Sequence, residues 1–145
     1  TSGPRCLNAL CLKRVGRQDF WNNVSDKTDP LVDFTLAEMM AANVGARYGE
    51  YSGATLSADP GDPGGNPILR YRSANNRGGW YWIEILPYRD PNETTNLVVD
   101  STNKRQLLLN LDVYVVYRIT AIAYGRKPTT MVVLQETYAR QRKKD

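Results

Sequence analysis

The chain has 145 residues, of which 41% are hydrophobic and 23% are charged, and it contains no histidine. This length and composition are typical of a single globular domain, which we place over residues 1–145. The lack of histidine excludes the usual Ser-His-Asp and Cys-His mechanisms and every zinc site that contains histidine. No apolar run reaches the roughly 20 residues that a membrane-spanning helix needs.

The net charge of +4 is unevenly distributed along the sequence. Residues 139–145 contain four basic side chains and one acidic side chain, so this basic tail carries +3 and the remainder about +1. Such a tail is either a solvated chain end or a site for nucleic acid or an anionic surface. Its basic side chains are Arg140, Arg142, Lys143 and Lys144.

The two cysteines, Cys6 and Cys11, lie close together in the sequence. Two interpretations are open at this point. The residues are either two reduced thiols of a cytosolic protein or one local disulfide of an exported protein. The spacing is not the Cys-x-x-Cys of redox and metal sites, and that favours a structural bridge.

A helix is predicted after the mixed segment 1–27, in which Phe20 and Trp21 are expected to anchor the chain to the core. Thr28 or Asp29 can cap the helix, and Pro30 suits its first position. Apolar residues then recur near helical spacing at Leu31, Phe34, Leu36, Met39 and Met40. Gly45 can end the helix in the left-handed conformation.

Strands are predicted in the second half of the chain. A glycine- and proline-rich loop over residues 45–67 precedes a short strand at 68–71 and a turn at 75–79. Residues 80–86 form a strong strand, stopped by Pro87, whose two apolar faces suggest cover on both sides. Two period-two runs, 111–124 and 130–138, flank a short turn and predict an antiparallel hairpin. The fold class is therefore α+β, with a helix packed on an antiparallel sheet.

Few residues in these elements could carry chemistry. Glu84 and Glu136 could form a carboxylate pair of the glycosidase type, but strand carboxylates more often pair with arginine, and Arg118 is a suitable partner. Aromatic residues cluster around the strong strand and either stack on a ligand or fill the core; their density favours the core for most of them. They are Tyr71, Trp80, Tyr81, Trp82 and Tyr88. We expect no enzyme activity, cofactor or metal.

The end of the sequence resembles the C-terminal signature of PilX-type minor pilins of type IV pili. The matching residues are Tyr117, Arg118, Ile119, Thr120 and Ala121, then Val132, Val133, Leu134, Gln135, Thr137 and Tyr138. The spaced cysteines before Trp21 and the segment Tyr81-Trp82-Ile83-Glu84 are similar to further landmarks of the family. The sequence departs from the family pattern at Glu136, where serine is usual, and at residues 122–124.

The resemblance implies a type IV pilin-like globular domain with a structural rather than catalytic function. It implies a Cys6–Cys11 disulfide, because pilins fold outside the cytoplasm. It also implies that the hydrophobic N-terminal helix and prepilin cleavage site of the family were removed from this sequence. Such a subunit would sit in the inner membrane with a periplasmic domain before assembly and in the pilus at the cell surface afterwards.

The implied function is to prime pilus assembly near the fibre tip. The expected partners are other minor pilins, the major pilin, a tip adhesin and, through the missing helix, the inner membrane; no small-molecule substrate is expected. From exposure alone, loops 57–67 and 87–106 are candidate partner surfaces. Their candidate residues are Asp59, Asp62, Tyr88, Arg89 and Asn92. The alternative is a pilus-associated subunit that binds DNA or a surface through the basic tail, although nucleic acid is not the expected partner.

Overall fold

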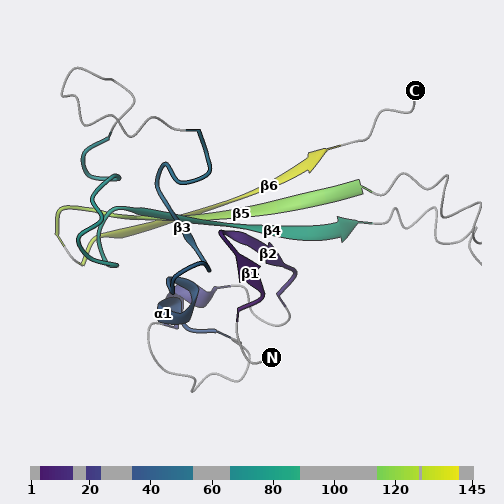
Figure 1. Ribbon diagram of the computed structural model, residues 1–145, viewed down its shortest axis with the longest axis horizontal. Coiled ribbons are helices and arrows are strands. Elements are labelled where there is room, and N and C mark those ends of the chain that lie inside the picture. Colours follow the sequence, from purple (N-terminus) through teal and green to yellow (C-terminus); the bar gives the residue numbers. More distant parts are fainter. Residues whose placement is uncertain are drawn as a thin grey trace, which may run out of the picture.

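The computed structural model describes residues 4–14, 19–23, 34–53, 66–88, 114–127 and 129–140. Its main feature is one six-stranded mixed sheet with the strand order β1-β2-β4-β5-β6, in which β3 pairs with β4. The helix α1 lies below the long strands in Figure 1. The strands are β1 (Cys6–Leu7), β2 (Leu10–Leu12), β3 (Ala46–Arg47), β4 (Gly79–Tyr88), β5 (Tyr114–Tyr124) and β6 (Met131–Arg140).

The predicted hairpin is confirmed as β5 and β6, which pair antiparallel from Val115–Arg140 to Tyr124–Met131 without interruption. Strand β4 pairs antiparallel with the other side of β5, so β5 lies between the other two long strands and β6 is an edge strand. The reason is local: β-branched and aromatic residues recur along each strand and suit a pleated surface.

Strand β4 is longer than predicted, because Pro87 does not stop it. Pro87 pairs with Val115, and β4 ends at Tyr88. The amide of Ile83 donates to Ala9 on the β2 side, so alternate residues up to Pro87 point their nitrogens away from β5. Strand β2 pairs with β4 only as far as Ile85, so the proline removes no hydrogen bond from either ladder.

The sheet is mixed, and the prediction of a wholly antiparallel sheet was wrong. Residues 6–12 form a tight hairpin through Asn8 and Ala9, both with positive φ, as a type I′ turn requires. This hairpin places β2 parallel to β4, with Leu10 opposite Ile83. The predicted strand at 68–71 was also wrong, since residues 67–70 form a turn.

The helix is much shorter than predicted. Helix α1 (Leu36–Met39) has four residues, and a short 3-10 helix η1 (Phe20–Asn22) precedes it. Thr35 caps α1 in a capping box with Glu38. The prediction of one continuous helix from near residue 30 to residue 44 was therefore wrong. The predicted caps at residues 28 and 29 lie outside the described residues. No described helix is long and apolar enough to cross a membrane.

Gly45 does not end the helix in the left-handed conformation; it permits a close approach. A Cβ atom there would lie 2.6 Å from the indole Nε1 of Trp82 and 2.9 Å from the carbonyl oxygen of Met39. Those two groups are themselves hydrogen-bonded at 2.8 Å. Glycine therefore lets the chain pass over the point where α1 meets β4.

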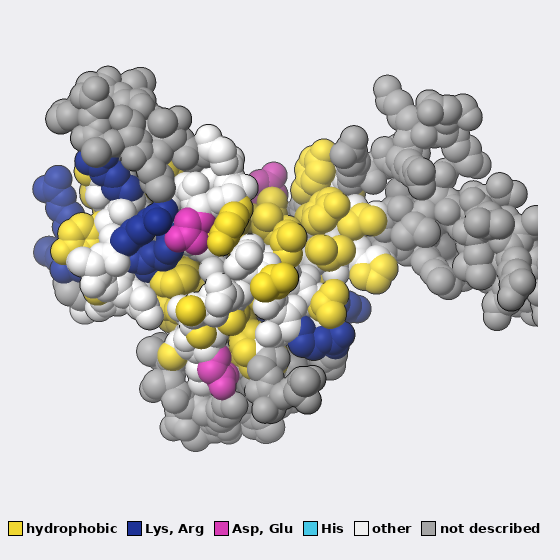
Figure 2. Space-filling view, viewed as in Figure 1, with side chains coloured by type: hydrophobic (Ala, Val, Ile, Leu, Met, Phe, Trp, Pro, Cys, Tyr) yellow, Lys and Arg dark blue, Asp and Glu magenta, His cyan; other side chains and the backbone are white. Residues whose placement is uncertain are grey.

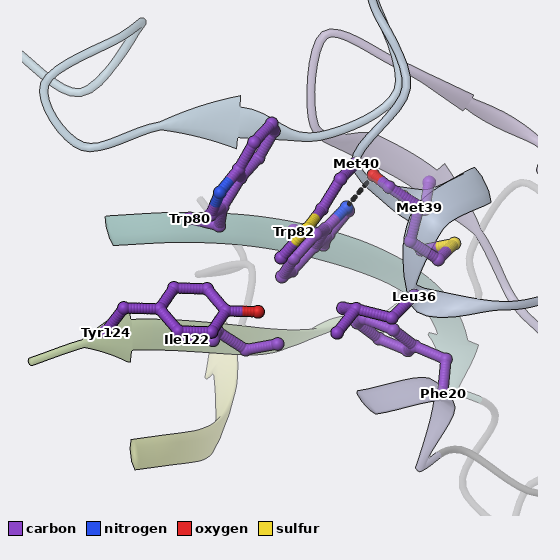
Figure 3. Close-up of a cluster of buried hydrophobic side chains, with 9 residues drawn as sticks. Phe20, Leu36, Met39, Met40, Trp80, Trp82, Ile122 and Tyr124 are labelled. Atoms are coloured by element: carbon purple, nitrogen blue, oxygen red, sulfur yellow. Dashed lines mark hydrogen bonds between the residues drawn. The ribbon is translucent and has the colours of Figure 1, made fainter. Parts of the chain in front are cut away.

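The core lies between α1, η1 and one face of the sheet (Figure 3). Trp82 is 1% exposed, its ring lies edge-on to Phe20 at 4.9 Å, and it stacks on Trp80 at 6.1 Å. Trp80 and Trp82 thus fill the core, as predicted, and Phe20 anchors the N-terminal segment. Of the other aromatic residues in that prediction, Tyr71 is exposed and Tyr81 is half-buried.

Candidate interaction surface

The sheet has two faces that differ in cover. We call the face against α1 and η1 the covered face; it carries Trp80, Trp82, Glu84, Thr120 and Ile122. The opposite face, which we call the open face, has no helix or strand packed across it among the described residues. Residues that pair across strands project from the same face, so the register assigns each side chain to one of the two.

The covered face holds a buried cluster of charges around Glu84. Its carboxylate is 1% exposed and accepts hydrogen bonds from Arg118 Nε at 3.0 Å and Nη2 at 2.6 Å. Glu84 Oε1 also accepts from the backbone amide of Arg14 at 2.6 Å, and Arg14 Nη2 lies 3.5 Å from Oε2. The expected pairing of Glu84 with Arg118 is therefore present.

Arg14 completes this cluster from a distant part of the sequence. Its guanidinium lies 4.6 Å from the centre of the Phe20 ring. Burial lowers the pKa of Arg14, and the nearby Glu84 raises it in part. One carboxylate thus holds together β4, β5 and the segment after β2, which is a structural task.

The cluster also removes the carboxylate-pair hypothesis. Glu84 pairs with Arg118 on the covered face, whereas Glu136 pairs with Ile119 on the open face. The two carboxylates therefore project from opposite sides of the sheet and do not form a pair, in keeping with the favoured pairing of Glu84 with Arg118. Among the described residues, no group of three or more Cys, Asp or Glu side chains is placed to hold a metal ion.

The signature residues of β5 divide between the two faces. Arg118 and Thr120 face the core, where Gln135 Nε2 donates to Thr120 Oγ1 at 3.0 Å. Tyr117 lies on the open face and stacks on Tyr138 of β6 with ring centres 6.3 Å apart. On β6, the signature residue Val133 also packs against the core.

The predicted disulfide is present between Cys6 and Cys11, whose Cα atoms are 4.0 Å apart. These residues face each other across the β1–β2 hairpin. The bond joins β1 to β2 at the edge of the sheet, and β2 in turn pairs with β4. Cys11 pairs with Glu84 and so lies on the covered face, where it is 1% exposed.

Apart from Glu136 on β6, the open face is largely apolar across the sheet. Leu10 and Leu12 are 52% and 49% exposed on β2, and Leu134 is 68% exposed on β6. Figure 2 shows hydrophobic side chains gathered over the long strands, to the right of centre. Half-buried apolar residues lie between these strands on the same face, at Ile83, Ile85, Tyr117 and Ile119. Contiguous apolar surface of this kind marks interaction sites in soluble proteins.

A hollow of about 250 Å³ adjoins this face near the β5–β6 turn. Ala121 and Ala123 leave space there, because their side chains are small. Val132, Leu134 and Leu69 are also among the lining residues. Ala121 of the signature therefore helps to form a shallow apolar depression.

The structure tests little of the predicted partner loops. Asp59, Asp62, Arg89 and Asn92 lie outside the described residues. Tyr88 ends β4, and its side chain lies outside the description as well. In the basic tail, Arg140 ends β6 and residues 141–145 are not described.

The apolar surface itself was missed by sequence reasoning. The signal was present in part, because residues 80–86 are apolar on both faces, and this pattern predicted cover on both sides; among the described residues, the helices pack on one face only. What the sequence did not show is that the short helix would cover only one face. It also gave no sign that Leu10 and Leu12 would join the same surface through a parallel pairing.

A comparison with known families now places the chain. The family described as type IV pilus assembly protein PilX C-term matches residues 7–140, from the β1–β2 hairpin to the end of β6. The chain belongs to the PilX family. Searches of curated proteins and of solved structures returned no match. Membership gives the protein a role in the type IV pilus and a location in the cell envelope.

Proposed function

We propose that this protein is a structural minor pilin that helps to prime type IV pilus assembly and sits near the fibre tip. The observation that carries the proposal is the PilX match over residues 7–140. Its partners in this role are other minor pilins, the major pilin and the tip adhesin. The domain is periplasmic before assembly and belongs to the pilus at the cell surface afterwards.

The arrangement of the described residues supports a subunit rather than an enzyme. The buried charges around Glu84 are engaged in holding strands together. The surface that remains is a broad apolar face, which suits contact with another protein better than capture of a small molecule. A subunit of a fibre needs such surfaces on its outside.

Deletion of the gene tests the proposal when surface pili are counted with retraction active and with retraction blocked. Loss of pili with retraction active, and their return when it is blocked, would indicate a subunit that promotes initiation. Loss in both backgrounds would indicate a subunit required for assembly itself. An unchanged count in both would contradict a priming role and favour DNA or surface binding.

The DNA-binding alternative has its own test. Removing residues 139–145 takes away four basic side chains. If the protein binds DNA through this tail, retention on DNA falls with salt and is lost in the shortened protein. No retention of the intact protein at low salt would reject the alternative.

A further inference from the structure

The outer edge of β6 is an exposed row of backbone hydrogen-bonding groups. The Gly125 amide donates to Thr130, and the Tyr124 amide donates to Gly78 on β4. In an antiparallel ladder, successive residues point their N–H and C=O groups alternately toward and away from the neighbouring strand. Counted from these two hydrogen bonds along the register, every second β6 residue points its N–H and C=O groups away from β5. The outward residues are Met131, Val133, Gln135, Thr137 and Ala139. No described strand pairs with them.

This edge lacks the features by which natural sheets prevent unwanted pairing. Such edges are usually short, bulged, or interrupted by proline or lysine. Strand β6 has ten residues, pairs one-for-one with β5, and contains neither proline nor lysine. Its one charged residue before Arg140 is Glu136. In Figure 1, the part of β6 toward its arrowhead lies above β5 and β4.

The charges at the two ends of β6 identify the kind of strand that fits. Arg126 and Lys127, both exposed, form the turn before β6, and Arg140 ends the strand with basic sequence after it. A second copy aligned antiparallel would bring the basic turn of one copy to the basic end of the other. A parallel copy would align turn with turn and end with end. Both arrangements juxtapose like charges, so self-pairing is disfavoured.

We infer that the outer edge of β6 binds an extended strand of a partner protein, with apolar residues at alternate positions and acidic residues at its ends. The outward amides and carbonyls supply the hydrogen bonds. One side of the added strand meets Leu134 and Tyr138, which flank Glu136, and so extends the largely apolar open face. The other side meets the exposed Gln135 and Thr137, which favour polar residues. The inference rests on the geometry of β6 and does not depend on the pilus role.

The probe is a synthetic peptide long enough to lie along the whole of β6. It contains alternating valine and threonine and two acidic residues at each end. Its binding to the purified protein is measured by titration calorimetry. Thr137→Pro removes one outward N–H without disturbing the β5 ladder, because Thr137 points that group away from β5. Thr137→Ala keeps the N–H and is the matched control. We expect the peptide to bind the Thr137→Pro variant at least roughly tenfold more weakly than the control.

Two peptides settle the matter on the unaltered protein if the proline variant does not fold. One carries N-methyl groups on alternate amides and the other on the complementary amides. Strand addition requires that one peptide of the pair binds and the other does not. Equal binding of both, or no binding of the unmethylated peptide, overturns the inference. A homodimer in sedimentation that Thr137→Pro disperses would also overturn it, in favour of self-pairing.

Discussion

The covered and open faces of the sheet are built from the same three long strands but do different things. The covered face contains Trp82, Ile122 and Glu84, each 1% exposed. The open face carries apolar side chains that are more than half exposed, such as Val132 at 54% and Leu134 at 68%. The difference shows that apolar character on a strand does not by itself indicate a core position. What decides is whether another element packs above it.

The largest expected effect comes from removing the centre of the covered face. Trp82→Ala deletes a buried ring that contacts Phe20 and Trp80, and it leaves the Met39 carbonyl without its indole donor. We expect a loss of about 5 kcal/mol in the free energy of unfolding, measured by urea denaturation. Tyr138→Ala on the open face is the control, with an expected loss of at most about 1 kcal/mol. Similar losses in both variants would show that the two faces are equally packed.

The charged cluster gives the next largest effect. Glu84→Ala leaves Arg14 and Arg118 beside each other without the carboxylate that joins them. Because removing one partner of a buried ion pair exposes the cost of burying the rest, we expect a loss of about 4 kcal/mol. The matched change Glu136→Ala, on the exposed side of β6, should alter stability by less than about 0.5 kcal/mol. A similar loss of stability in both variants would mean that the buried ion pairs of Glu84 contribute no more than an exposed carboxylate does.

Features that depend on residues close together in the sequence were predicted correctly more often than features that join distant segments. The β5–β6 hairpin was predictable because a short turn joins two runs that alternate with period two. The pairing of Glu84 with Arg118 followed from the common preference of strand carboxylates for arginine. The pairing of Leu10 with Ile83 joins segments more than 70 positions apart, and no local pattern encodes it. The mixed character of the sheet was therefore out of reach.

The helix shows a different kind of failure, in which two local signals competed. Pro30 after Thr28 and Asp29 is a sound helix start, and Thr35 with Glu38 is a sound capping box. The chain uses the second signal. The box bonds Thr35 Oγ1 to the Glu38 amide at 3.1 Å and the Glu38 carboxylate to the Thr35 amide at 3.0 Å. Two reciprocal bonds fix a start more firmly than a favourable φ alone.

The Cys6–Cys11 disulfide lies at the β1 edge of the sheet, opposite the β6 edge. Replacing both Cys6 and Cys11 with alanine should lower stability by about 2 kcal/mol, because the bond closes a six-residue loop in the unfolded chain. Urea denaturation of the variant and of the reduced parent protein should agree. A loss near zero would mean that the hairpin pairs equally well without the bond. That result would leave the β1 edge protected by its shortness alone.

The smallest effect on stability is expected on the open face. Leu134→Thr keeps a strand-forming residue but removes apolar surface that is already 68% exposed. Because little of this side chain is buried on folding, stability should change by less than about 0.5 kcal/mol, whereas binding of a hydrophobic dye should fall. A loss above about 2 kcal/mol would show that another part of the protein covers this face in solution. The small change would instead leave the face free for a partner, as the surface of an assembly subunit requires.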